Sequence, residues 1–150
     1  MTTYYKATRP DGTDFRTGTI DYAAALASEK IIRHLAAKRV KDDPSTYLSV
    51  SVAAADCTGL KWPCRLFRVE PVGRTIRATD LPNKRACSAL RVVEELPAWQ
   101  ALGPNGEAVA AHIERCRSLT AQQTKDLDAA WDAAWDAARD AAWDAAWDAA

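Results

Sequence analysis

The end of the chain sets the strongest constraint on the fold, because residues 128–150 repeat the unit DAAW, with Arg139 in one tryptophan position. Alanine has the highest helix propensity, and no glycine or proline interrupts the repeat. Thr120 and Gln123 occupy the first and last positions of a helix capping box. We therefore expect one helix from 121 to 150, ~45 Å long at ~1.5 Å per residue, which is longer than a small domain needs to cover its core.

The aromatic residues of this repeat form a slanting stripe on the expected helix. Four residues turn an α-helix by ~400°, so each repeat moves the stripe by ~40° around the axis. Left-handed and right-handed coiled coils instead need periods of about 3.5 and about 3.67 residues. Exposed tryptophan at this density indicates a surface that a partner covers, and the expected contact residues are Trp131, Trp135, Arg139, Trp143 and Trp147. The alternative is a solvated, partly frayed helix without a partner.

Charge is distributed unevenly along the chain. Residues 128–150 carry six aspartates and one arginine, a net charge of −5, so residues 1–127 of the neutral chain carry +5. Arg139 is expected to pair with Asp136 or with an aspartate of another helix. An aspartate at every fourth residue excludes a membrane-spanning helix, and the repeat lacks the basic residues of an interfacial helix. The basic residues of the domain are too few and too scattered to indicate nucleic-acid binding. The tryptophan stripe of the tail instead predicts a homo-oligomer or another protein partner.

The start of the chain has the pattern of a hairpin. Residues 2–8 and 13–19 contain β-branched and aromatic residues, and Arg9-Pro10-Asp11-Gly12 between them is typical of a turn. Proline presets φ in such a turn, and glycine accepts a positive φ. We therefore expect two antiparallel strands, with Phe15 facing the core.

The middle of the chain predicts a mixture of short elements. Asp21 is expected to cap a helix that begins at Tyr22, and Ile31 either continues this helix toward residue 40 or begins a strand. A break at 42–45 precedes three segments with strand patterns, at 46–52, 64–72 and 89–96, the last of which also fits a helix. Other expectations are helical turns at 53–57 and 98–102, an irregular stretch at 74–84, and a helix at 107–117 that buries Val109, Ile113 and Cys116.

Strands followed by helices indicate an α+β fold. We expect a small mixed domain at 1–118, with an N-terminal hairpin and an antiparallel sheet, followed by a helical tail at 119–150. The four cysteines have no CxxC spacing and are expected to be reduced thiols, partly in the core. His112 and Cys116 stand at i and i+4 of a helix, a pair too small to predict a metal site. We expect no metal, no cofactor and no catalytic residue.

Three sequence segments resemble those of a known family: residues 5–15 (YKATRPDGTDF), 62–70 (WPCRLFRVE) and 84–95, which ends in LRVVEE. Over residues 4–96 the chain resembles uncharacterised small proteins encoded by actinobacterial phages and prophages. Tails rich in alanine, tryptophan and arginine are common after such domains. The resemblance implies an accessory or particle-associated role, either in the cytoplasm of the bacterial host or in the virion, and it transfers no catalytic residue.

An enzymatic alternative comes from the order of three short motifs. An ADP-ribosyltransferase-like fold has an aromatic–basic pair on its first strand, a Ser-x-Ser strand in the middle and a glutamate near the end. This chain has Tyr5 followed by lysine, then Ser49 and Ser51, then Glu95, but the usual arginine or histidine is absent from the first strand. Short motifs without their structural context remain hypotheses. The main expectation is a non-enzymatic binding or structural module that self-associates or docks through its tail; a phage inhibitor of a host factor is the third alternative.

Overall fold

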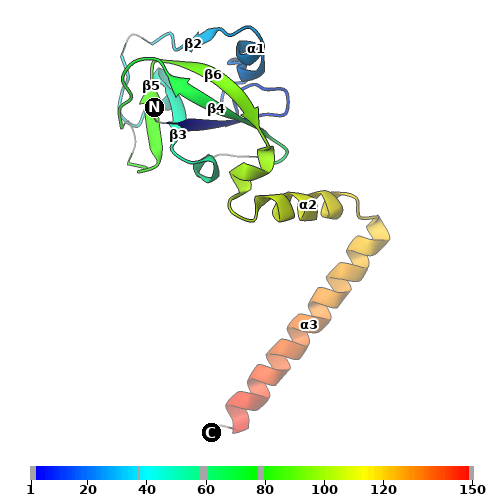
Figure 1. Ribbon diagram of the computed structural model, residues 1–150. Helices are drawn as coiled ribbons and strands as arrows, with labels where there is room; N and C mark the ends of the chain where they lie inside the picture. The colour runs from blue at the N-terminus through cyan, green and yellow to red at the C-terminus, as the bar shows by residue number, and fades with distance from the viewer. Residues whose placement is uncertain (1–2, 37, 58–60, 78–79, 149–150) are drawn as a thin grey trace. The chain divides into compact units, whose positions relative to one another are not determined.

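The computed structural model describes residues 3–36, 38–57, 61–77 and 80–148. Residues 1–2, 37, 78–79 and 149–150 belong to segments interpreted above and lie outside the described residues. The chain divides into two compact units, Met1–Ala110 and Ala111–Ala150. The first unit holds a curled antiparallel sheet and the second holds the long C-terminal helix (Figure 1), which confirms the α+β class.

One six-stranded sheet has the strand order β2-β6-β4-β1-β3-β5. Its strands are β1 (Tyr4–Thr8), β2 (Ile31–Arg33), β3 (Leu48–Ser51), β4 (Arg65–Pro71), β5 (Lys84–Cys87) and β6 (Ala89–Leu96). All neighbouring pairs are antiparallel. A register shift between Arg68 and Val69, in the pairing of β4 with β6, marks a bulge, and such bulges bend a strand and increase its twist.

Both faces of the central strand β4 are buried. Leu66 faces one core, whereas Phe67 and Val69 face the other, and each of these side chains is fully buried. Helix α1 (Tyr22–Ala27) belongs to the Phe67 side, where the Tyr22 and Phe67 rings stack with centroids 6.4 Å apart. The 3-10 turn η3 (Ala98–Leu102) packs against β4 on the Leu66 side through Ala101. The sheet is therefore covered on both faces, which is typical of a stable small core.

Helix α1 begins where its cap was expected. The Asp21 carboxylate accepts the backbone N–H of Ala24 at 2.8 Å. The helix ends at Ala27, and Glu29 takes a left-handed φ of 53°, which ends any helical continuation. Ile31 then begins β2, which pairs with β6. Of the two alternatives for this segment the strand is therefore the one present, and the described residues form no helix continuing toward residue 40.

The second strand expected at 13–19 is not formed, which corrects the predicted hairpin. The turn before it is present, since the Gly12 N–H donates to the Arg9 carbonyl at 2.9 Å. After the turn, the Asp14 carboxylate accepts the backbone N–H groups of Arg16, Thr17, Thr19 and Ile20. These bonds satisfy donors that a strand would have paired in a ladder. The segment is therefore a loop, and β1 pairs with β4 and β3 instead.

The remaining short elements mostly match the sequence patterns. Strands β3, β4 and β6 lie inside the segments expected for them, and β6 has the expected bounds. The 3-10 turns η2 (Ala54–Asp56) and η3 also lie where helical turns were expected. A further 3-10 turn, η1 (Pro44–Thr46), begins within the break expected at 42–45. Phe15 packs against the Leu66 core, as expected of an inward residue. Strand β5 is missed, because the sequence patterns predict an irregular stretch at 74–84 and no element at 85–88.

Helices α2 (Gly106–Arg117) and α3 (Ala121–Asp148) end the chain. The capping box of α3 is present: the Gln123 N–H donates to Thr120 Oγ1 at 3.2 Å, and Gln123 Oε1 accepts the Thr120 N–H at 2.9 Å. Helix α2 was expected to bury three residues, of which Val109 and Cys116 are exposed and Ile113 is half-buried. Its charged and alanine-rich sequence leaves too narrow an apolar stripe to form a buried face. Among the described residues, no helix is long and apolar enough to cross a membrane.

Candidate functional site

The four tryptophans of the repeat are exposed on α3. The exposed fractions are 71% for Trp131, 65% for Trp135, 69% for Trp143 and 83% for Trp147. Their spacing of four residues places them on one slowly winding row of the helix surface, because i and i+4 side chains are neighbours. The helix thus presents an aromatic ridge to its surroundings. Contacts between neighbouring side chains of one helix contribute only about 0.2–0.5 kcal/mol per pair, so an exposed aromatic ridge of this kind is the first candidate for an interaction surface.

Arg139 stands in the same row as these tryptophans and forms intrahelical ion pairs. Its guanidinium lies 3.0 Å from the Asp136 carboxylate and 3.7 Å from that of Asp140. The expected pairing with Asp136 is therefore present. All three side chains are largely exposed, and such a pair contributes at most about 0.3–0.5 kcal/mol to the helix. The arginine partly neutralises the aspartate row near the middle of the repeat.

The residues of the enzymatic alternative separate into two places. Tyr5 on β1 pairs with Ser51 on β3, so these residues and Ser49 belong to neighbouring strands. Glu95 lies on β6 and pairs with Arg65, whose Nε donates to Glu95 Oε1 at 2.7 Å. The first-strand lysine and the two serines line one cavity, and Glu95 is not among the described residues around it. The order of the motifs along the chain therefore does not bring the glutamate to the serines.

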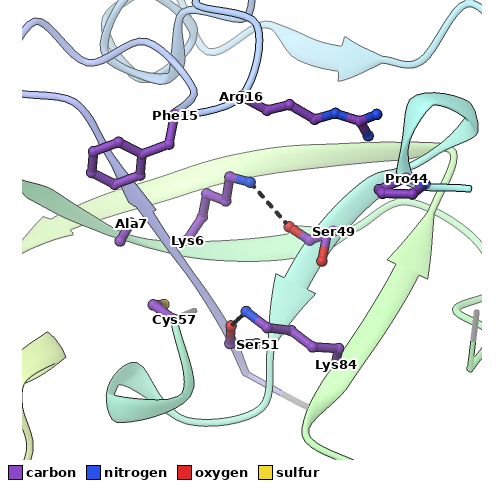
Figure 2. Close-up of a pocket in the computed structure, with 9 residues that line it drawn as sticks. All are labelled: Lys6, Ala7, Phe15, Arg16, Pro44, Ser49, Ser51, Cys57 and Lys84. Carbon is purple, nitrogen blue, oxygen red and sulfur yellow. Dashed lines mark hydrogen bonds between the residues drawn. The ribbon is translucent and has the colours of Figure 1, made fainter. Parts of the chain in front are cut away.

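That cavity opens where β1 and β3 separate (Figure 2). The two strands share the pair Tyr5–Ser51, whereas β1 pairs with β4 along its whole length. The cavity measures about 390 Å³ and lies between these strands, the loop after Gly12 and the turn η1. Its lining residues are Lys6, Ala7, Phe15, Arg16, Pro44, Ser49, Ser51, Cys57 and Lys84. This volume falls within the range of small-molecule sites, about 300–1,000 Å³.

The thiols do not form a metal centre among the described residues. Cys57, Cys64 and Cys87 are buried, and burial raises the pKa of both Cys64 and Cys87 to about 11. Cys116 is exposed, with its sulfur 3.6 Å from His112 Nε2. Cys64 and Cys87 are therefore core residues that remain protonated thiols at neutral pH.

The tryptophan ridge was found from the sequence, but the cavity was not. Its cationic residues come from β1, the loop at 14–20 and β5, and their approach depends on a strand order that no local pattern reveals. The available signal was the alternating Ser49-Val50-Ser51 pattern next to a lysine-bearing first strand. That signal was interpreted as a possible enzyme motif and not as the wall of a binding cavity.

Comparison with known proteins adds one distant similarity. No family model matches the chain, and no solved structure matches it. The chain is 28% identical over 117 residues to the DNA mismatch repair protein MutL of Pseudomonas fluorescens (strain SBW25). The match covers 71% of this chain but 18% of MutL, so the chain spans less than a fifth of that protein. The similarity does not show membership of a family.

Proposed function

We propose that the protein is a non-enzymatic, phage-type binding or structural module that self-associates through α3. The observation that carries the proposal is the ridge of four exposed tryptophans, Trp131, Trp135, Trp143 and Trp147. Tryptophan is the residue type most enriched in the centres of protein interfaces. The resemblance of residues 4–96 to phage and prophage proteins supports the context. The similarity to MutL involves too small a share of that protein to support a role in repair.

The four-residue spacing of the tryptophans favours a second copy of α3 as the partner that covers them. Rows of side chains at i±4n form ridges inclined by about 26° to the helix axis, and two helices that interlock such ridges cross at about 50°. The tryptophans form one such row, and the alanines beside them form shallow rows into which an aromatic side chain fits. The aspartates lie ~100° around the helix from the preceding tryptophan, at the edge of such a contact. Two copies can therefore cross with the tryptophans nearest the crossing point buried and the aspartates solvated.

Charge supplies a test of this arrangement. Each copy brings a net charge of −5 on residues 128–150, so crossed tails repel one another at low ionic strength. Salt screens this repulsion, because the Debye length falls to ~10 Å at about 0.1 M. Association of the tails through their tryptophans should therefore strengthen as salt is added. Association of one tail with the basic domain of another copy has the opposite response, since salt weakens attraction between unlike charges. The direction of the salt effect thus distinguishes the two contacts.

The experiment is light scattering on the full chain, on a chain ending at Leu127 and on two single variants. Trp135→Ala removes a central tryptophan, and Gln122→Ala is its control on the first turn of the same helix. We expect a defined oligomer for the full chain and the control, favoured by salt. We expect a monomer after truncation and weaker association for Trp135→Ala. If the full chain and the truncated chain are both monomers at all salt concentrations, self-association through α3 is refuted, and a heterologous host protein becomes the partner to seek.

The enzymatic alternative makes a separate prediction. An ADP-ribosyltransferase-like protein should bind NAD near Tyr5, Ser49 and Ser51 with a glutamate in reach. Because Glu95 is paired with Arg65 on β6, away from the described lining of the cavity, we expect NAD to leave the melting temperature unchanged. A melting shift that is lost in Glu95→Gln would revive the enzyme.

A further inference from the structure

Three basic side chains line the cavity between β1 and β3. They are Lys6, Lys84 and Arg16, and among the described residues none of them forms an ion pair. The lining of this cavity contains no carboxylate within the described part of the chain. Carboxylates outside this lining act on these cations from a distance without pairing with them, among them Asp14, Asp56 and Asp43. Gathering like charges without paired counterions costs free energy, and it is seldom kept in a fold without a function. The local excess of positive charge therefore points to an anionic ligand.

Lys6 and Lys84 approach the serines of β3 from opposite sides (Figure 2). The Lys6 ammonium donates to the Ser49 carbonyl at 3.4 Å, near the limit of a hydrogen bond, and lies 5.6 Å from the centroid of the Tyr22 ring. The Lys84 ammonium donates to Ser51 Oγ at 2.7 Å. Burial, followed by repulsion from Lys84, lowers the pKa of Lys6. These contacts leave most of the donor capacity of both amines unused, because each ammonium has three donors.

Further unused donors lie in the same lining. No hydrogen bond of the Ser49 hydroxyl or of the Arg16 guanidinium occurs among the described residues. A second cavity of about 190 Å³ shares Lys6, Arg16 and Ser49 with the first. Tyr22 and Tyr47 line this second cavity, and their buried hydroxyls have no hydrogen-bond partner among the described residues. Such unpartnered buried hydroxyls are rare in native proteins and call for an explanation.

One carboxylate, that of Asp14, lines the second cavity, and it offsets part of the positive charge near Lys6 without forming an ion pair with it among the described residues. Asp14 lines that cavity, but four backbone N–H groups and the Thr17 hydroxyl already bind its oxygens. It also raises the pKa of Lys6, although this effect is smaller than those of burial and Lys84. Asp14 therefore shapes the loop beside the site. Among the described lining residues, three cationic side chains against one carboxylate still leave a net positive charge in the two cavities.

We propose that the two adjoining cavities together bind a phosphate monoester of a small organic molecule, with the phosphate between Lys6, Lys84 and Arg16. A phosphate monoester carries a charge of about −1.5 to −2 at pH 7 and three acceptor oxygens. Lysine recognises it as a point charge, and arginine adds a planar pair of donors at the rim. The Ser49 hydroxyl supplies a neutral donor. A bare phosphate leaves most of the volume unfilled, and Phe15 and Ala7 form an apolar wall for the organic group.

The test is calorimetric titration of the full chain with phenyl phosphate, using inorganic phosphate and benzoate as comparison ligands. Lys6→Met and Lys84→Met remove one charge each with little change in volume, and Ser49→Ala removes a neutral donor while keeping every charge. Lys30→Met is the matched control, because Lys30 is exposed and lies outside both cavities. Near-ultraviolet circular dichroism of each variant verifies that the core remains packed.

We expect phenyl phosphate to bind at one site per chain and more tightly than inorganic phosphate. The affinity should fall by about tenfold or more in each lysine variant, equal to about 1.4 kcal/mol per tenfold change, and severalfold in Ser49→Ala. The control Lys30→Met should bind like the parent. The proposal is overturned by an absence of saturable heat, or by equal losses in Lys6→Met and Lys30→Met. Benzoate binding as tight as phenyl phosphate would overturn the assignment to a phosphate group.

Discussion

Replacing Asp14 with asparagine tests the account of the loop that follows β1. Asp14 is 5% exposed, and its carboxylate accepts backbone N–H groups at 2.7 Å from Thr17 and 3.0 Å from Ile20. Burial by itself raises the pKa of this carboxyl. The N–H groups of Thr17 and Ile20, the Thr17 hydroxyl and the charge of Lys6 outweigh burial and lower the pKa from 3.8 to about 2. The ionised carboxylate is therefore more stable in the folded chain than in the unfolded chain.

The size of this contribution follows from the pKa difference. One pKa unit corresponds to about 1.36 kcal/mol, so a shift from 3.8 to about 2 stabilises the folded state by about 2 kcal/mol at neutral pH. The side chain is almost wholly buried, so solvent screens its hydrogen bonds little. An asparagine retains one oxygen acceptor but loses the charge and the second oxygen. We expect Asp14→Asn to lower the free energy of unfolding by about 2 kcal/mol at pH 7.

The pH dependence gives the sharper test. A carboxyl with a depressed folded pKa stabilises the fold fully above its unfolded pKa of 3.8, and the stabilisation is lost as the pH falls to about 2. The asparagine side chain of the variant does not titrate, so the difference in unfolding free energy between parent and variant should shrink steadily over that window.

Urea unfolding followed by near-ultraviolet circular dichroism measures this difference at several pH values. The slope of free energy against urea should stay unchanged, which shows that both chains unfold to the same extent. Asp128→Asn is the control, because it removes an exposed carboxylate from α3 and should not alter the stability of the sheet domain. A difference between parent and Asp14→Asn that stays constant from neutral pH down to the acid limit would refute the reasoning.

Three further predictions compare buried with exposed positions of the chain. Gly12→Ala should destabilise the domain by about 2 kcal/mol or more in the same urea assay, because Gly12 has a φ of 89° and an added Cβ would lie 2.5 Å from the Ala23 Cβ. Phe67→Ala should cost about 3–5 kcal/mol, whereas Leu35→Ala, at a side chain 99% exposed, should be nearly neutral in thermal melting. In a thiol-labelling assay of the native chain Cys116 should react alone, and the three buried cysteines should react after urea is added.

The parts of the fold that sequence alone could predict are those fixed by neighbouring residues. Asp21 caps α1, and Thr120 with Gln123 caps α3, because each motif needs partners within three or four positions. Strand β6 was placed with its observed bounds from its apolar pattern and the proline after it. Local chemistry of this kind does not depend on the order of strands in the sheet.

The elements that the sequence did not predict correctly depend either on distant residues or on side-chain contacts that a composition pattern does not reveal. The loop after Gly12 has a strand-like composition, but the Asp14 carboxylate binds four later N–H groups and Gly18 has a φ of 71°, neither of which is compatible with a regular strand. Strand β5 is short, and its partner β3 lies far away in the sequence. Helix α2 has the length and the periodicity of a packed helix, but its apolar residues are too few.

The two candidate sites differ in the same way. The tryptophan ridge arises from one repeat on one helix, so it was visible in the sequence. The cationic cavity assembles residues from β1, the Asp14 loop, β3 and β5, and it exists because β1 leaves β3 after a single shared pair, Tyr5–Ser51. No single residue of this cavity stands out in the sequence, and the site is recognised only when the fold brings these residues together.

We therefore expect the charge of Lys6 to lower the stability of the fold while it favours binding of an anion. Burial lowers the pKa of Lys6, which means that the charged amine destabilises the fold relative to the unfolded chain, where its pKa is near 10.5. This destabilisation is fully present below the folded pKa and is relieved as the pH rises toward the unfolded value. In Lys6→Met the amine is absent, so the variant should be more stable than the parent at neutral pH, and the gap should narrow at alkaline pH.

Saturating phenyl phosphate should reverse the order at neutral pH, because it stabilises the parent by mass action and binds the variant weakly. Urea unfolding of both chains, with and without this ligand, measures all four free energies. Lys30→Met provides the reference for a lysine that is exposed. If Lys6→Met is less stable than the parent in the absence of any anion, Lys6 supports the fold in its own right, and the tension between stability and binding does not exist.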